Sequence, residues 1–213
     1  MINYLLMEQE FESKADYIKI QIEKDFNALN ESKLKFFEQI KEDPRSISFL
    51  DYYNKTVLDR EKIDFRKFKY NWGLQGLTGQ ELDIFGRDFD KLKEEIKKEK
   101  DIEKFFKNHC CPPATIKRQA SFCSKLFHTI LPAEFPPLDD TIIQKLHLQK
   151  DVLNPIKDVL IIKRGYESFI KENKDKIVFV KTFLSKPEFA YLRINESSDI
   201  RVIDMYYHFG SFY

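Results

Sequence analysis

Several residue types that mark common protein classes are scarce in this chain of 213 residues. Three cysteines, an odd number, do not make a disulfide framework, so the composition favours a reducing compartment and we expect a cytoplasmic protein. No apolar run approaches the roughly 18 residues that a membrane span needs. Met1 to Gln9 has no basic region before an apolar stretch. We therefore expect no membrane partner and no secretory signal.

Aromatic residues are plentiful, and the two signs of charge nearly cancel. With 20 Phe and 10 Tyr, the chain can build a hydrophobic core, which disordered chains cannot. The net charge of +1 hides a gradient, because Met1–Asp59 holds 8 basic and 12 acidic residues, whereas Thr141–Arg193 holds 11 and 6. An acidic head followed by a basic body is compatible with a polyanionic partner, and it is also common in proteins that bind no nucleic acid.

The spacing of apolar residues is mostly helical. It predicts helices at about 4–28, 30–43, 46–58, 88–99, 116–131, 141–148, 155–173 and 199–209. Residues 176–194 stay open between helix and strand, because Ile177–Val180 has the composition of a strand. The tight turns typical of hairpins are absent, so the expected fold class is all-α, or nearly so. We divide the chain into an N-terminal helical region, 1–108, and a second helical region, 109–213.

Glycine is scarce, yet three of the six glycines fall within residues 73–79, directly after the single tryptophan, Trp72. Upstream, the basic residues Arg66, Lys67 and Lys69 interleave with aromatic residues. An exposed aromatic ring can stack on a base while basic side chains contact phosphates, so this strip is a candidate nucleic-acid contact. The alternative is an ordinary loop, with phenylalanines in the core and lysines in water. Neither glycine signature for phosphate binding is present.

The cysteines and histidines do not predict a metal site. His109, Cys110, Cys111, Cys123 and His128 lack the spacing of structural zinc ligands, and adjacent cysteines cannot both chelate comfortably. Cys123 lies on an amphipathic stretch and is expected to be a small buried hydrophobic residue. We predict no metal and no cofactor.

The segment 113–146 is the most informative part of the chain. The predicted helix places Ser121, Ser124, Lys125 and His128 on one side, and a proline-bounded turn then leads to Asp139 and Asp140. A capping-box pattern predicts that the next helix begins just after them, so that both carboxylates sit at its positive end. A lysine and a carboxylate brought together could serve catalysis. The alternative is a capping aspartate and a solvent-facing lysine.

Residues 120–128 and 135–142 resemble the catalytic segment of the helix-hairpin-helix DNA glycosylase superfamily. Within that superfamily they are most similar to the 8-oxoguanine-glycosylase-like bacterial branch. That superfamily has a lysine in a helix and a later turn with a catalytic aspartate, and Pro137–Ile142 matches this turn with Asp139 at the catalytic place. The tail 201–210 is similar to the terminal helix of the same branch. The hairpin glycines of the family are missing before Lys125, and the separation of Lys125 from Asp139 is shorter than usual.

The resemblance implies a compact, two-lobed helical bundle with a cleft between the lobes. It implies a hydrolase, a DNA glycosylase that flips a damaged or modified base and removes it, in DNA repair or antiviral defence. Asp139 would stabilise the sugar cation or activate water, Lys125 would attack C1′, and Asp140 would support them. The remaining residues that we expect to contact substrate or DNA are Trp72, Arg66, Lys67, Lys69, Ser124, His128, Lys117 and Arg118.

Two other functions stay open at this point. The chain could be a non-catalytic nucleic-acid-binding protein of the same fold, whose salt-dependent DNA binding survives loss of Asp139. It could instead be a helical protein-interaction module that uses the acidic Met1–Asp59 head as its docking surface, without affinity for DNA.

Overall fold

The computed structural model describes residues 2–74, 89–99, 101, 104, 119–148 and 155–210, and these residues form helices, with no strand among them. The all-α class expected from the sequence is thus confirmed for the described part of the chain. Over the same ranges, no helix combines the length and the apolar character that crossing a membrane requires. The helices are α1 (Ile2–Asn27), α2 (Glu31–Leu34), α3 (Phe36–Gln39), α4 (Pro44–Tyr53), α5 (Phe65–Asn71), α7 (Phe89–Lys98), α9 (Gln119–Ile130), α10 (Asp140–Lys145), α11 (Pro155–Glu172), α12 (Lys174–Leu184) and α13 (Asp199–Phe209). Shorter helical turns are η1 (Ile40–Glu42), η2 (Asn54–Leu58), η3 (Pro187–Leu192) and η4 (Ile194–Glu196).

Side-chain caps fix the starts of several helices. Asp43, Asp64 and Ser198 each accept a hydrogen bond from a backbone N–H in the first turn of the helix that follows. α10 begins at Asp140 because the Asp139 carboxylate accepts the N–H of Thr141 at 2.8 Å. The capping-box pattern therefore placed the start slightly late, since Asp139 is itself the cap.

Several regions differ from the helices expected. The single helix expected over 30–43 is instead α2, α3 and η1, and α5 lies where no helix was expected. The helix expected over 46–58 is α4 followed by one π-helical turn, η2. The ambiguous stretch 176–194 contains no strand: it is most of α12, followed by η3 and the start of η4. Pro187 begins η3, and Arg193, with φ of 47°, separates it from η4. The strand composition of Ile177–Val180 is explained by burial, because Ile177 and Val180 face the core of a helical protein.

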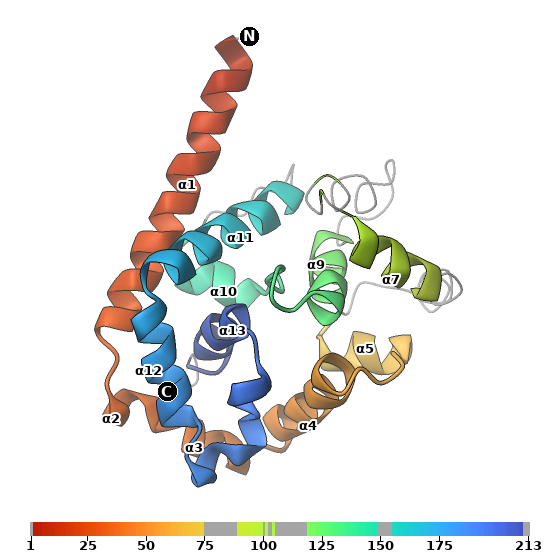
Figure 1. Ribbon diagram of the computed structural model, residues 1–213, viewed down its shortest axis with the longest axis vertical. Helices are drawn as coiled ribbons and strands as arrows, with labels where there is room; N and C mark the ends of the chain where they lie inside the picture. The colour runs from red at the N-terminus through yellow and green to blue at the C-terminus, as the bar shows by residue number, and fades with distance from the viewer. Residues whose placement is uncertain are drawn as a thin grey trace.

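The first long helix packs on a helix from the far end of the chain. α1 packs against α11 (Figure 1). Ion pairs between Glu10 and Lys157 and between Lys19 and Glu172 join the two helices. They approach most closely at Gly165, where a β-carbon would lie 2.5 Å from Cγ2 of Ile18. Because a contact this short is not tolerated, the packing requires glycine at this position.

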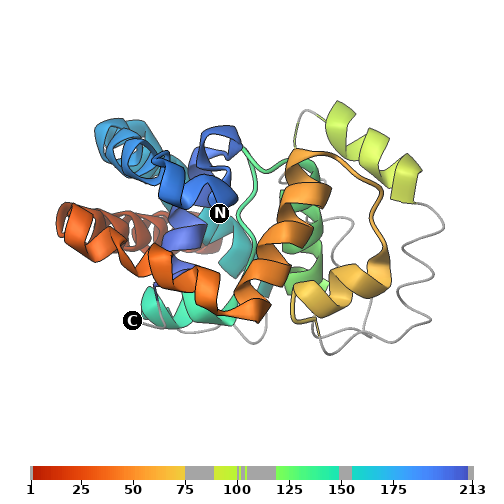
Figure 2. The same ribbon diagram turned by 90° about the horizontal axis from the view of Figure 1, so that it is seen from below.

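The helices gather in two groups that share one hydrophobic core. Figure 2 shows α1, α12 and α13 on one side, and α4, α5, α7 and α9 on the other. The segment 131–139 crosses between the groups, from α9 to α10. α13 is almost completely buried and contacts α10, α11 and α12. The expected division at residue 108 lies outside the described residues, and the contact of α1 with α11 joins the two expected regions.

We expect Gly165→Ala to destabilise the protein by about 1 to 3 kcal/mol, because the added methyl group overpacks the α1–α11 contact. An alanine at an open helical position would instead stabilise the helix by roughly 0.5 to 1 kcal/mol relative to glycine. Urea unfolding measures the difference. Lys171→Ala, at an exposed position of the same helix, is the control, and its free energy of unfolding should hardly change. A Gly165→Ala variant as stable as the wild type would contradict the close packing.

Candidate active site

A pocket of about 150 Å³ lies where α4, α5 and α13 meet the segment that links α9 to α10. Apolar side chains and ionisable side chains share its walls. The residues that matter for chemistry are Phe49, Trp72, Asp139, Arg201, Asp204 and His208. The pocket therefore brings together groups from four parts of the chain that are distant in sequence.

The polar side of α9 fixes the segment before Asp139. The Ser124 hydroxyl accepts the N–H of Leu138 at 2.9 Å, and the Ser121 hydroxyl donates to the carbonyl of Leu138 at 3.2 Å. Nδ1 of His128 donates to the carbonyl of Phe135 at 2.6 Å. Since each hydrogen bond links a side chain of α9 to the backbone of the segment, the entry to α10 is held in one place. The prediction that these side chains share one side of the helix is confirmed.

Asp139 lies in the pocket wall, with about 25% of its side chain exposed. One carboxylate oxygen accepts the N–H of Thr141, and the other lies 3.8 Å from Nζ of Lys125. Burial alone would raise the pKa of Asp139, but the positive charge of Lys125 and the hydrogen bonds from Thr141 outweigh it, so the pKa lies below its usual value. At neutral pH the group is a carboxylate.

Lys125 is buried behind the pocket and is not one of the residues that form its wall. Its Nζ donates to the carbonyl of Trp72 at 2.8 Å, in addition to its ion pair with Asp139. Burial lowers the pKa of Lys125, and the neighbouring carboxylate of Asp139 opposes that shift. One ammonium group thus connects the turn after α5 to the start of α10.

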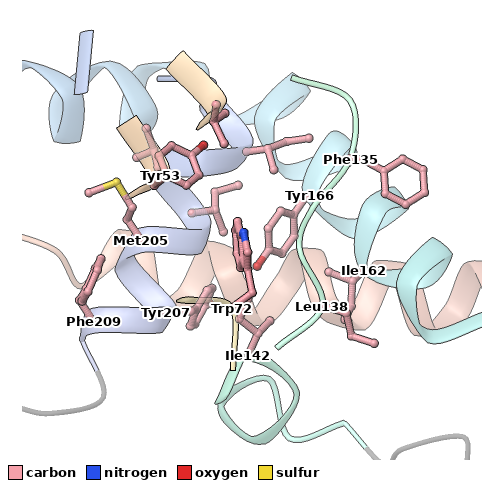
Figure 3. Close-up of a cluster of buried hydrophobic side chains, with 14 of the residues drawn as sticks. Tyr53, Trp72, Phe135, Leu138, Ile142, Ile162, Tyr166, Met205, Tyr207 and Phe209 are labelled. Atoms are coloured by element: carbon pink, nitrogen blue, oxygen red, sulfur yellow. The ribbon is translucent and has the colours of Figure 1, made fainter. Parts of the chain in front are cut away.

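Trp72 is buried, in contrast to the exposed ring expected from the sequence, although it does line the pocket. Its ring meets those of Phe49, at 5.1 Å between centroids, and Phe68, at 6.1 Å. Figure 3 shows it within the cluster of buried side chains. The chain then turns at Gly73, whose φ of 63° favours glycine. Trp72 is therefore a fixed wall of the pocket.

His128, expected to contact substrate, is completely buried. Because its Nδ1 proton goes to the carbonyl of Phe135, its Nε2 accepts the hydroxyl proton of Tyr53, at 3.0 Å. Burial lowers the pKa of His128 to about 3, so it is neutral. We assign it, like the buried Ser124, a structural role in holding the pocket wall.

Sequence reasoning missed three residues of the pocket. Arg201, Asp204 and His208 lie three and four positions apart on α13 and therefore share one face of that helix. Arg201 and Asp204 form a buried ion pair, and the guanidinium lies 3.9 Å from the ring centre of Tyr53. Burial raises the pKa of Asp204, opposed by Arg201, and burial lowers the pKa of His208. Three polar residues at helical spacing in an otherwise apolar helix were the signal that could have revealed them.

The other predicted contact residues lie apart from the pocket wall. Arg66 and Lys67 are exposed at the start of α5, and Lys69 is half-buried nearer its end. Asp140 is exposed and begins α10. Lys117 and Arg118 lie outside the described residues, as do three members of the histidine and cysteine set, His109, Cys110 and Cys111.

A metal site is not formed by the described residues, which contain no group of three or more His, Cys, Asp or Glu placed to hold an ion. Cys123 is buried, as the sequence predicted.

Comparisons of the chain with protein-family models, with curated proteins and with solved structures found no match. The assignment of a function therefore depends on the pocket and on the sequence resemblance.

We expect acidification to destabilise the protein partly through His128. Its pKa is about 3 when folded and near 6.5 when unfolded, so below pH 6.5 the unfolded state binds more protons and the free energy of unfolding falls as pH falls toward 3. Between pH 6.5 and 5 this one group accounts for about 2 kcal/mol. His128→Gln should flatten the pH dependence of urea unfolding. Equal slopes in the wild type and this variant would refute this account.

Proposed function

We propose that this protein is a DNA glycosylase that removes a base by cleaving its N-glycosidic bond. The observation that carries the proposal is the ionised carboxylate of Asp139 in the wall of a pocket, held by Lys125 and the N–H of Thr141. The resemblance of residues 120–128 and 135–142 to the helix-hairpin-helix superfamily supports it. A two-lobed bundle of that superfamily, with the pocket in the cleft between the two groups of helices, is part of the same proposal.

The chemistry needs little more than this carboxylate. As the bond from C1′ to the base nitrogen breaks, its electron pair leaves with the base and the sugar becomes cationic. A carboxylate fixed beside the sugar lowers the barrier because it stabilises the charge that develops there. A water molecule then attacks C1′ and gives its proton to Asp139 or to solvent, and the departed base takes up one proton, so that the products are the neutral base and an abasic site. Every bond that breaks or forms is accounted for without a metal or a cofactor.

Lys125 is a positioning residue in this scheme. Its Nζ is engaged by the carbonyl of Trp72, at 2.8 Å, and by Asp139, at 3.8 Å, on the far side of the pocket wall. To attack C1′, Nζ of Lys125 would have to break its contacts with both of these partners. We therefore favour hydrolysis, with water as the nucleophile, over a covalent intermediate on Lys125.

DNA would supply the base and would be contacted by the exposed part of α5. The nucleotide must leave the duplex stack, at a cost of a few kcal/mol, before it reaches a pocket. Arg66 and Lys67 are exposed there, and Tyr70 is 82% exposed two residues before Trp72. Such groups suit contacts to phosphates and stacking on bases. A role in repair or in antiviral defence, in the cytoplasm, would follow from this activity.

Asp139→Asn should lower the rate of base release by about a hundredfold or more, because the substituted side chain is uncharged. Asparagine keeps the cap of α10, but the buried ammonium of Lys125 loses its anionic partner, so thermal stability should fall and thermal melting must show that the variant is folded at the assay temperature. Release is measured as abasic sites in duplexes that carry damaged or modified bases. Asp43→Asn makes the same change at the cap of α4, away from the pocket, and should keep full activity. Full activity in Asp139→Asn would refute the assignment, and DNA binding without any cleavage by the wild type would indicate a non-catalytic binding protein.

Lys125→Met should leave some activity but move the acidic limb of the pH profile to higher pH. The lysine charge holds the pKa of Asp139 down, so removing that charge raises the pKa, and protonation begins at higher pH. Lys163→Met removes another buried lysine, one paired with Glu167, and should not move the profile. Borohydride should trap no adduct between the wild type and DNA. A trapped adduct that Lys125→Met abolishes would show instead that Lys125 is the nucleophile.

A further inference from the structure

Arg201 has hydrogen-bonding capacity that the protein does not use. The residue lines the pocket and is 1% exposed. Its Nη1 donates to Asp204, whereas its Nε and Nη2 have no hydrogen-bond partner. A buried donor without a partner costs free energy, and the cost is larger when the group is charged. Such an arrangement in a pocket wall points to a ligand that supplies the acceptors.

The two unpaired nitrogens of Arg201 determine how the acceptor atoms of such a ligand must be arranged. The Nε–H and one Nη2–H of a guanidinium lie on the same edge and point in nearly the same direction. They therefore form a fork that fits two neighbouring acceptor atoms at once. Trp72, another residue of the pocket wall, has an indole N–H that is also buried without a partner. Two side chains of the wall thus hold donor atoms that the protein leaves unpaired.

Charge and shape narrow the choice of ligand. A phosphate or carboxylate would suit the fork, but the carboxylates of Asp139 and Asp204 line the same pocket and would repel an anion. The rings of Phe49 and Trp72 form apolar walls, which suit a flat, neutral ring. A volume of about 150 Å³ is enough for an aromatic ring, since an engineered cavity of about that size binds benzene.

We propose that Arg201 selects the base, and that the pocket accepts bases whose edge carries two adjacent hydrogen-bond acceptors. This inference rests on the proposed function, which brings a base into the pocket. Guanine and hypoxanthine have such a pair in O6 and N7, the pair with which arginine most often reads DNA. Cytosine has one in O2 and N3. Adenine has a donor next to N7, and thymine has a donor between its two carbonyl groups, so both leave one arm of the fork unpaired.

The single tryptophan of the chain lines this pocket, so its fluorescence reports directly on occupancy. The experiment titrates the wild-type protein with four free bases, namely hypoxanthine, cytosine, adenine and thymine. We expect hypoxanthine, cytosine or both to bind at least about tenfold more tightly than adenine and thymine. Which of the two binds more tightly distinguishes a purine pocket from a pyrimidine pocket.

Two further measurements test whether the Nε–H and Nη2–H fork of Arg201 recognises the base. For a purine pocket, 7-deazahypoxanthine lacks only the N7 acceptor and should lose about tenfold in affinity relative to hypoxanthine. Arg201→Lys keeps the charge beside Asp204 but has no fork, so the preference among the four bases should fall to about twofold or less. Thermal melting checks that this variant is folded. If the variant does not fold, the comparison of the four bases on the wild-type protein still shows whether the pocket requires two adjacent acceptors.

The proposal is overturned if adenine or thymine binds as tightly as the other two bases, if no base changes the fluorescence, or if Arg201→Lys keeps the preference. These outcomes are separate from those that test the proposed function. Selective binding of bases by a protein that cleaves no DNA would refute the glycosylase assignment and leave this inference standing. Cleavage of DNA without preference for guanine-type or cytosine-type bases would refute this inference and leave the glycosylase assignment standing.

Discussion

The pocket depends on the two contacts that the buried ammonium group of Lys125 makes. This group joins the carbonyl of Trp72, at the end of α5, to the carboxylate of Asp139, at the start of α10. These two elements belong to different groups of helices, so one charge sets the spacing between opposite walls of the pocket. A buried charge is costly unless it is paired, and here the carbonyl and the carboxylate together provide the pairing.

The three further ionisable groups of the pocket, Arg201, Asp204 and His208, come from α13. Arg201 is held between the ring of Tyr53 and the carboxylate of Asp204, which gives the guanidinium an apolar contact and an ionic one. Burial raises the pKa of both Asp139 and Asp204, but at Asp139 the charge of Lys125, together with the other nearby charge and the hydrogen bonds from Thr141, lowers the pKa below its usual value, whereas at Asp204 the effect of burial exceeds that of Arg201. The pocket thus presents two carboxylates with different affinities for a proton, a difference that catalytic sites commonly use.

Local sequence signals predicted most of the longer helices and, among the residues of the pocket wall, Trp72 and Asp139. The apolar period located α1, α11 and α13, and the spacing of polar residues on α9 predicted that Ser124 and Lys125 share one side. Such signals depend on neighbours within a turn or two, which the sequence displays directly. The burial of Trp72, in contrast, results from contacts with rings of α4 and α5 and with His128. The spacing of Arg201, Asp204 and His208 indicates that they share one face of α13, but that this face lines the pocket follows only from the docking of the whole helix.

The packing of α1 on α11 has a consequence for how the protein forms in the cell. The two partners lie at nearly opposite ends of the described chain, and Gly165 must be made before Ile18 can find its place against it. Because a ribosome delivers the N-terminal helix first, the apolar side of α1 has no native partner for most of synthesis. Contacts between residues so distant in sequence also slow folding. The apolar side of α1 therefore stays without its α11 partner until the chain has been synthesised beyond Glu172.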